Sequence, residues 1–234
     1  MSGGHLRQGC FITGTDTGIG KTRVAAGLLR TLARQGKTVV GMKPVASGAT
    51  TTRDGLRNDD ALLLQASASM SRDYALVNPY CFAPAIAPHL AAAEAGVEIR
   101  LEPILDAYRQ LSHGAEFAVV EGVGGWQVPL SGSLALPDLA RALELPVLLV
   151  VGMRLGCLNH ALLTARAIEA GGLALAGWVA NEIDPGFERC EANVATLEAM
   201  LPAPLLGRLS HTPGAPPERS ADALAAACAK LTSA

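Results

Sequence analysis

Aromatic and charged residues are scarce in this chain of 234 residues, at 4% and 17% of the total, whereas 50% of the residues are hydrophobic. So much apolar material can bury a large core, which argues against long disordered or low-complexity segments. The net charge is only −2, and the arginines and lysines are scattered rather than gathered in a basic stripe. We therefore expect no nucleic-acid partner. The chain length predicts one α/β domain over residues 1–234.

Paired cysteines and long apolar runs are also missing. The five cysteines are odd in number and never form a C-x-x-C pair, which argues against a disulfide framework and a zinc knuckle. No apolar run approaches the roughly 18 residues of a membrane-spanning helix. The first residues, MSGGHLRQG, lack the apolar region of a signal peptide. We expect reduced thiols, no membrane contact and a cytoplasmic protein.

Short apolar runs alternate with longer segments of helical periodicity. Strands are expected at CFIT, TVVGM, FAVVE, PVLLVVG, LAGWVAN and PLLGRL, and helices at about Lys21–Gln35, Asn58–Ala68, Glu102–Ser112, Asn159–Ala170 and Phe187–Met200. Strands this apolar are buried on both faces, so the pattern predicts an α/β fold with a doubly wound, mostly parallel sheet and helices on both faces. Ligands bind such sheets outside the carboxyl ends of the strands, where this sequence places its glycines and polar residues.

The segment GTDTGIGKT nearly matches the phosphate-binding pattern G-x-x-x-x-G-K-[ST], but its first glycine stands one residue too early. A phosphate loop needs glycines so that backbone N–H groups converge on an anion, a lysine for the outer phosphates and a hydroxyl for Mg²⁺. These features are supplied by Gly14, Gly18, Gly20, Lys21 and Thr22. A strand precedes the loop and a helix follows it, and the dipole of that helix favours phosphate. The alternative is an ordinary strand-to-helix turn.

Charged residues follow other predicted strands. Glu121 ends the buried run FAVVE and could ligate the Mg²⁺ that accompanies a nucleoside triphosphate, or only pair with a surface cation. Asp59 and Asp60 lie in the first turn of the helix that Asn58 is expected to cap. Either aspartate could be a second ligand, or both could only compensate the helix dipole. Lys43 follows the second strand, where a fixed ammonium would stabilise a transferring phosphoryl group.

Two further segments at strand ends are candidates for binding a substrate. Ser47 lies in a Ser/Gly loop, which could contact a substrate or only form a turn. The segment GCLNH opens a helix that Asn159 can cap, and the backbone donors of Cys157, Leu158 and Asn159 bind either a carboxylate or water. No second metal-binding side chain stands at ligand spacing beside His89 or His160, so no transition-metal site is predicted.

A series of segments, in order along nearly the whole chain, closely resembles dethiobiotin synthetase, a family of biotin synthesis within the P-loop NTPases. The segments are ITGTDTGIGKT, GMKPVASG, GLRNDDALLLQ, VNPYCF, VVEGVGGWQVPL, LPVLLVVGMRLGCLNHALLTA, LAGWVAN and PAPLLG. That family characteristically carries the longer loop G-T-D-T-x-x-G-K-T, which accounts for the displaced glycine. Many relatives have glutamate where this chain has Gly18, so any nucleotide contact of that glutamate is absent or replaced here.

The resemblance implies a Mg²⁺- and ATP-dependent ring closure. In that family, 7,8-diaminononanoate (diaminopelargonate) and CO₂ become dethiobiotin while ADP and phosphate are released. One amine takes up CO₂ as a carbamate, ATP phosphorylates the carbamate to a mixed anhydride, and the second amine attacks the anhydride to close a cyclic urea. The resemblance also implies a homodimer with the active site at the subunit interface.

The same resemblance assigns residues of this chain to each part of the site. The implied catalytic residues are Lys43, Lys21 and Thr22, and the implied Mg²⁺ ligands are Thr22, Asp60 and Glu121. The implied nucleotide site consists of Gly14, Thr15, Asp16, Thr17, Gly18, Ile19, Gly20, Lys21, Thr22, Asp60, Glu121, Asn181, Pro204, Leu205, Leu206 and Gly207, of which Asn181 and the last four would contact adenine. The implied substrate site consists of Thr17, Lys43, Ser47 and Gly124, together with Cys157, Leu158 and Asn159 of the partner subunit.

Three other readings of the sequence compete with this one. Amide-forming synthetases such as the cobyrinate amidases typically carry a glutamine-hydrolysing domain, for which this chain has no room. Partner-switched ATPases of the partitioning or nitrogenase-iron-protein type usually have an extra lysine early in the loop, where this chain has TDTG. A nicotinamide-binding Rossmann protein would open its first helix with G-x-G-x-x-G, which is missing here.

Overall fold

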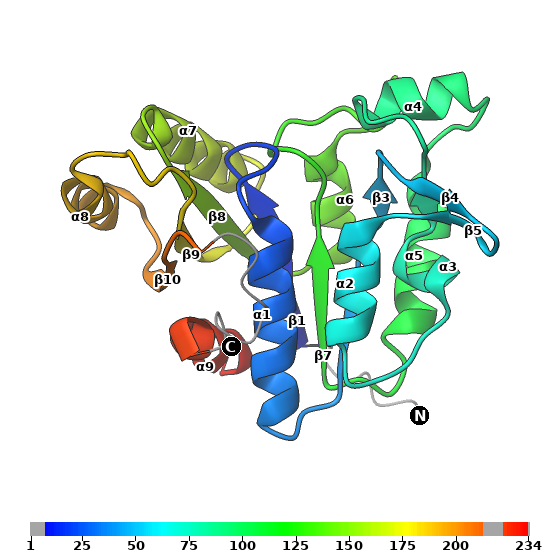
Figure 1. Ribbon diagram of the computed structural model, residues 1–234, viewed down its shortest axis with the longest axis horizontal. Coiled ribbons are helices and arrows are strands. Elements are labelled where there is room, and N and C mark those ends of the chain that lie inside the picture. The colour runs from blue at the N-terminus through cyan, green and yellow to red at the C-terminus, as the bar shows by residue number, and fades with distance from the viewer. Residues whose placement is uncertain (1–7, 213–221, 234) are drawn as a thin grey trace.

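A six-stranded sheet runs through the computed structural model, which describes residues 8–212 and 222–233 (Figure 1). Its strands are β1 (Gln8–Gly14), β2 (Val39–Met42), β7 (Phe117–Glu121), β8 (Val147–Met153), β9 (Leu175–Glu182) and β10 (Leu205–Leu209). The strand order is β10-β9-β8-β1-β7-β2, and every pairing is parallel. The connections that follow the neighbouring strands β1 and β8 leave in opposite directions, toward β2 and toward β9, which makes this the switch point where ligands bind in such sheets. The predicted fold class and all six predicted strands are confirmed.

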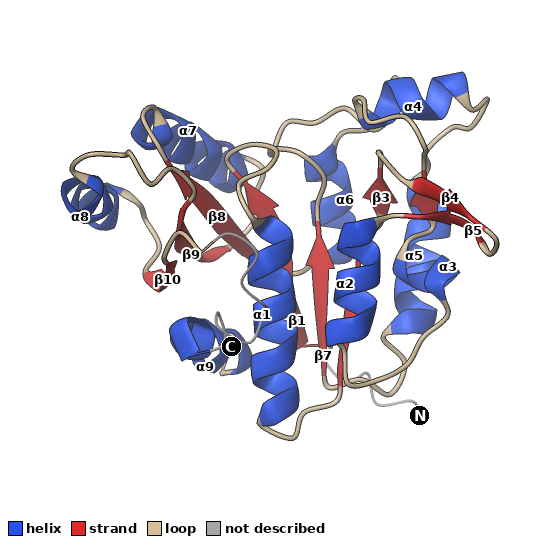
Figure 2. Cartoon of the chain, viewed as in Figure 1, coloured by secondary structure: helices blue, strands red, loops and turns tan. Residues whose placement is uncertain are grey.

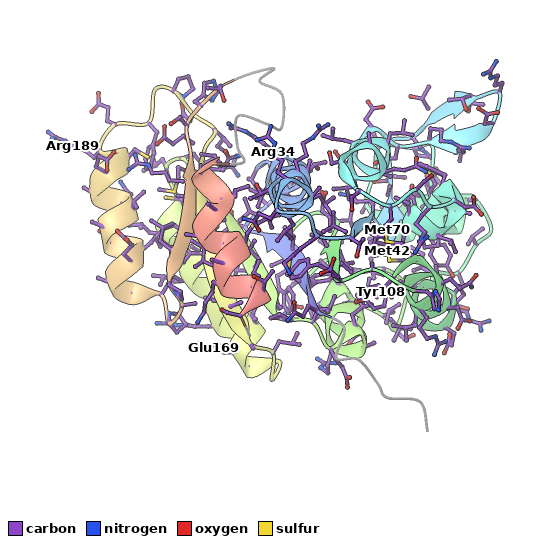
Figure 3. The ribbon with its side chains drawn as sticks, turned by 90° about the horizontal axis from the view of Figure 1, so that it is seen from below. Arg34, Met42, Met70, Tyr108, Glu169 and Arg189 are labelled. Atoms are coloured by element: carbon purple, nitrogen blue, oxygen red, sulfur yellow. The ribbon has the colours of Figure 1, made fainter. Side chains whose placement is uncertain are left out.

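Helices cover both faces of the sheet (Figure 2). One face carries α1 (Lys21–Arg34), α2 (Asp59–Ser67) and α9 (Ala225–Thr232), and the other carries α5 (Leu101–Leu111), α6 (Leu136–Leu143), α7 (Cys157–Ala170) and α8 (Cys190–Met200). Figure 3 looks along the sheet from below, with Arg34 at the end of α1 on one side and Tyr108 of α5 on the other. In β1, Cys10 and Ile12 pack toward α1, whereas Phe11 packs toward α5 and α6. Burial on both faces explains the uninterrupted apolar runs of the strands.

Two predicted helices begin at other residues than expected. Helix α7 begins at Cys157, because Gly156 adopts the left-handed conformation (φ 94°) and turns the chain into the helix. Asn159 therefore lies inside the first turn and does not cap it, which corrects the prediction. Helix α8 begins at Cys190 because the preceding residues form a turn, in which the side chain of Asp184 accepts a hydrogen bond from the backbone N–H of Gly186 at 2.9 Å.

Several short elements were not predicted. They are β3 (Val45–Ala46) with β6 (Tyr80–Cys81), the hairpin of β4 (Thr50–Thr52) and β5 (Gly55–Arg57), α3 (Tyr74–Val77), α4 (Pro88–Glu94), η2 (Asp222–Leu224) and α6. Most of them are too short to show a periodicity. The longest, α6, is anchored at its start by Asp138, whose side chain accepts from the backbone N–H of Ala135 at 2.9 Å. Within residues 8–212 and 222–233, none of the helices has the length and apolar character needed to cross a membrane.

Candidate active site

The phosphate loop joins the carboxyl end of β1 to α1 at the upper edge of the sheet in Figure 1. Gly20 precedes the helix with a left-handed φ of 88°, a conformation that residues with a Cβ seldom adopt. Packing also requires glycine here, because a Cβ would lie 2.2 Å from Nδ2 of Asn181. No side chain of the described residues caps α1. The first backbone N–H groups of the helix are therefore available to an anion in the loop.

Lys21, the first residue of α1, folds back under the loop. Its Nζ donates a hydrogen bond to the backbone carbonyl oxygen of Asp16 at 2.8 Å, and the residue is only 6% exposed. Burial, followed by the nearby Lys43 ammonium, lowers the pKa of Lys21 to about 8, against the opposing effect of Glu121 and other carboxylates. A bound polyphosphate would place negative charge beside this ammonium and so raise the pKa of Lys21 again.

An ionic cluster stands beside the loop, built from the ends of three elements. The Nζ of Lys43, just after β2, donates to Oε1 of Glu121 at 2.6 Å, to Oδ2 of Asp60 at 3.0 Å and to the carbonyl oxygen of Gly122 at 3.2 Å. Thr22 adds its hydroxyl, which donates to the same Oε1 of Glu121 at 2.9 Å. Lys43 thus has three acceptors that hold its ammonium in one place.

Burial and charge act against each other on these groups. Burial opposes charge on Lys43, but the carboxylates of Glu121 and Asp60 outweigh it and raise the pKa of the ammonium. Burial of Asp60 is likewise outweighed by the ammonium of Lys43, so the pKa of Asp60 is lowered. Glu121 is fully buried, and this burial raises its pKa although Lys43 opposes the shift. The cluster therefore keeps Lys43 charged at neutral pH.

The oxygens of this cluster fit a magnesium ion. Oε2 of Glu121 is buried and has no hydrogen-bond partner among the described residues. A buried carboxylate oxygen without a partner is costly unless a ligand satisfies it. Thr22 and Asp60 add a hydroxyl and a second carboxylate, and Mg²⁺ prefers such oxygen donors.

A cavity of about 320 Å³ joins the loop to the ionic cluster. Its walls come from the phosphate loop, from the segments that follow β2 and β7, and from the start of α2. The lining residues are Thr17, Gly18, Gly20, Lys21, Thr22, Lys43, Ala46, Ser47, Asn58, Asp60, Glu121, Val123 and Gly124. The neighbouring Asp59 is exposed. The structure thus brings together most of the predicted phosphate, Mg²⁺ and substrate residues, and it adds the apolar walls Ala46 and Val123.

Comparison with known proteins identifies the family. A family model described as AAA domain matches residues 8–219. The ATP-dependent dethiobiotin synthetase BioD of Xanthomonas euvesicatoria pv. vesicatoria is 56% identical over 205 residues, which cover 88% of this chain and 92% of that protein. The enzyme of the same name from Pseudomonas aeruginosa (strain UCBPP-PA14) is 57% identical over 208 residues, covering 88% and 91%. This chain belongs to the ATP-dependent dethiobiotin synthetase family.

Solved structures agree on the fold of this dethiobiotin synthetase family member. The MinC:MinD cell division protein complex of Aquifex aeolicus aligns with a TM-score of 0.62 and 17% identity over 97% of this chain and 96% of that chain. A ParA family ATPase of Chlorobium tepidum aligns with a TM-score of 0.55 and 14% identity over 97% and 96%. At such identities the likeness shows the P-loop NTPase fold alone.

Some residues that the dethiobiotin synthetase resemblance assigned to the phosphate loop have supporting roles. The side chain of Ile19 is buried between two strand ends, since a Cβ on Gly14 or on Gly152 would lie 2.6 Å from it. Thr15 donates its backbone N–H to the carbonyl oxygen of Val150 at 3.0 Å. These contacts fix the course of the loop, and neither Thr15 nor Ile19 lines the cavity.

The predicted adenine contacts of Pro204, Leu205, Leu206 and Gly207 stay a prediction. Leu205, Leu206 and Gly207 form the amino end of β10 and Pro204 directly precedes it, at the opposite edge of the sheet from the phosphate loop, and Leu206 is buried against Gly177. Asn181 pairs instead with Leu209, at the carboxyl end of the strand. In a parallel sheet only that end reaches the ligand. Leu209 and the segment that follows it therefore lie on the same edge of the sheet as the phosphate loop.

Two arginines near the loop were missed by sequence reasoning. Arg154, directly after β8, forms an ion pair with Asp16 of the loop, and its position at a strand end was a usable signal. Arg23 in α1 contacts Asn181 and the segment after β10, and no local pattern marks it. Cys157, Leu158 and Asn159 of this chain do not line its own cavity.

Proposed function

We propose that this chain catalyses the Mg²⁺- and ATP-dependent carboxylation and ring closure of 7,8-diaminononanoate with CO₂ to dethiobiotin, releasing ADP and phosphate, in biotin biosynthesis. The observation that carries the proposal is the ionic cluster of Lys43, Glu121 and Asp60 in one cavity with the phosphate loop. It occurs in a chain that is more than half identical to enzymes named ATP-dependent dethiobiotin synthetase.

ATP would be bound by its phosphates and by its base. The loop amides and Lys21 would bind the phosphates, and Thr22, Asp60 and Glu121 would hold Mg²⁺. When bound, the metal neutralises charge on the phosphate oxygens. Asn181 would read adenine, because its amide both donates and accepts hydrogen bonds.

The chemistry requires a carbamate and a good leaving group. One amine of the diamine attacks CO₂, forms an N–C bond and loses a proton. An oxygen of this carbamate attacks the γ-phosphorus of ATP, and the bond to the bridging oxygen breaks so that ADP leaves. The second amine then attacks the carbonyl carbon, loses its proton and expels phosphate, closing the cyclic urea.

Lys43 is placed to lower the barrier of the phosphoryl transfer. Its ammonium is held by three acceptors at 2.6 to 3.2 Å, so it does not need to reorganise as negative charge develops. Lys21 supplies a second cation on the phosphate side. Ser47, Thr17 and Gly124 line the same cavity and would contact the diamine or its carbamate.

We propose that the substrate carboxylate is bound in a homodimer. The start of α7 presents backbone N–H groups to an anion, although that of Cys157 also donates to the carbonyl oxygen of Arg154 at 3.0 Å. This helix start does not line the cavity of its own chain. Leu155, beside this helix start, is 90% exposed, and Leu163 of α7 is 56% exposed. A two-fold contact through this apolar surface would let Cys157, Leu158 and Asn159 of the partner subunit bind the carboxylate.

The test is an incubation with Mg·ATP, bicarbonate and 7,8-diaminononanoate, in which dethiobiotin is followed by mass spectrometry and ADP release in parallel. We expect dethiobiotin and ADP in a one-to-one ratio, with neither above background for Lys43→Met. ADP release that does not depend on the diamine, without a cyclic urea, would refute the proposal and favour a partner-switched ATPase.

A further inference from the structure

Arg23 connects three segments of the chain that meet beside the phosphate loop. It lies in the first turn of α1, two residues after Lys21. Its guanidinium donates to Oδ1 of Asn181 at 3.3 Å, to the carbonyl oxygen of Ser210 at 3.0 Å and to Oγ1 of Thr212 at 2.7 Å. One side chain thus joins the helix, the end of β9 and the segment after β10.

The amide of Asn181 is held from both sides. Its Nδ2 donates to the carbonyl oxygen of Ile19 at 2.7 Å, while its Oδ1 accepts from Arg23. A rotated amide would set its oxygen against the Ile19 carbonyl and its NH₂ against the guanidinium, so both contacts would become repulsive. The residue is only 3% exposed, which restricts other rotamers. Arg23 and Ile19 therefore fix which side of the amide is donor and which is acceptor.

A fixed amide distinguishes adenine from guanine. Each contact leaves one N–H and one lone pair of Asn181 unused. Adenine offers a matching acceptor and donor at N7 and the 6-amino group, whereas guanine offers two acceptors, N7 and O6. A fixed amide would place its oxygen against O6 of guanine. Without Arg23 the amide is held only through the N–H that it donates to Ile19, so it can tilt its other N–H between N7 and O6 of guanine and move its oxygen away from O6.

We propose that Arg23 is a specificity-determining positioning residue that favours adenine over guanine nucleotides by anchoring Asn181 and the segment from Ser210 to Thr212. The inference rests on the proposed function in one respect, namely that the phosphate loop takes a nucleoside triphosphate whose base reaches Asn181. Arg23 contacts the base only through the residues that it holds.

The test is direct binding of the non-hydrolysable analogues of ATP and GTP, with Mg²⁺, to the full chain by calorimetry. The variants are Arg23→Met, Arg34→Met as an exposed arginine at the far end of the same helix, and Asn181→Ala with and without Arg23→Met. We expect Arg23→Met to reduce the preference for the ATP analogue by about tenfold, the effect of one well-placed base contact. Arg34→Met should leave the preference unchanged, and Arg23→Met should change it no further once Asn181 is alanine.

Equal weakening of both analogues by Arg23→Met would overturn the inference, since it would give Arg23 only a structural or phosphate-attracting role. An undiminished effect of Arg23→Met in the Asn181→Ala background would overturn it as well. Melting temperatures of all variants separate these outcomes from a loss of fold. Because binding is measured without turnover, a failure of ring closure would refute the proposed function while leaving this test intact.

Discussion

Replacing Lys43 by methionine should destabilise the protein in a way that depends on pH. The side chain of Lys43 is 4% exposed and that of Glu121 is fully buried. Without the ammonium, Glu121 must remain charged in an apolar site or take up a proton. Protonating a carboxyl of ordinary pKa 4.5 at pH 7 costs about 3.4 kcal/mol, at about 1.36 kcal/mol per pH unit. This agrees with the roughly 3–5 kcal/mol lost when one partner of a buried ion pair is removed.

Because burial already raises the pKa of Glu121 beside Lys43, the expected loss is at most about 3 kcal/mol at pH 7, or roughly 10 °C in melting temperature for a chain of this size. It should shrink as the pH falls toward 4.5, because Glu121 is then protonated in the unfolded state as well. The assay is urea unfolding of wild type and variant at several pH values between 5 and 8. Lys37→Met is the matched control, since Lys37 is partly exposed and lies 3.9 Å from exposed Glu116, and such exposed pairs contribute little to stability.

A second variant separates stability from catalysis. Lys43→Met combined with Glu121→Gln removes both charges, so we expect most of the lost stability to return. Activity should not return, because the ammonium that stabilises the transferring phosphoryl group is still missing, at a loss of about 10²–10³ in kcat. A destabilisation by Lys43→Met that is equal at pH 5 and pH 7 would refute the reasoning, as would normal kcat in either variant.

Three further predictions concern the metal, the loop lysine and the loop glycine. Asp60→Asn should raise the Mg²⁺ concentration for half-maximal activity by about tenfold or more, and exposed Asp59→Asn should not; equal effects in a Mg²⁺ titration would contradict the assignment. ATP binding should take up a proton between pH 8 and 10, because bound phosphate restores the charge on Lys21, whose pKa is about 8. Calorimetry in two buffers of different ionisation enthalpy measures this uptake, and its absence would show that Lys21 does not meet the phosphates. Gly18→Glu should change the binding constants of nucleotides with little effect on diamine binding. A Cβ at position 18 would have open space around it, although the φ of 72° is strained for any residue other than glycine. Binding constants that stay unchanged for ATP, CTP and GTP would count against a nucleotide contact at this position.

Much of the site could be predicted because buried parallel strands leave a local signature. Apolar runs locate the strands, and the residues that end them must meet at one edge of the sheet. That rule placed Lys43, Glu121 and the phosphate loop together. The residue pattern alone did not decide which of the neighbouring Asp59 and Asp60 is the second Mg²⁺ ligand, and the family resemblance selected Asp60. Consecutive helical residues point about 100° apart, and of these two aspartates only Asp60 lines the cavity.

What the sequence by itself determined was therefore the sheet, its ligand-binding edge and the charged groups that end its strands. Only the tertiary structure decided which residues of β10 lie on the same edge of the sheet as the phosphate loop, because strand register depends on packing against β9 and α9. It also decided the role of Arg23, whose partners Asn181 and Ser210 lie 158 and 187 residues away in the chain. Periodicity and motifs report local order, whereas contacts over such separations form only when the whole sheet is assembled.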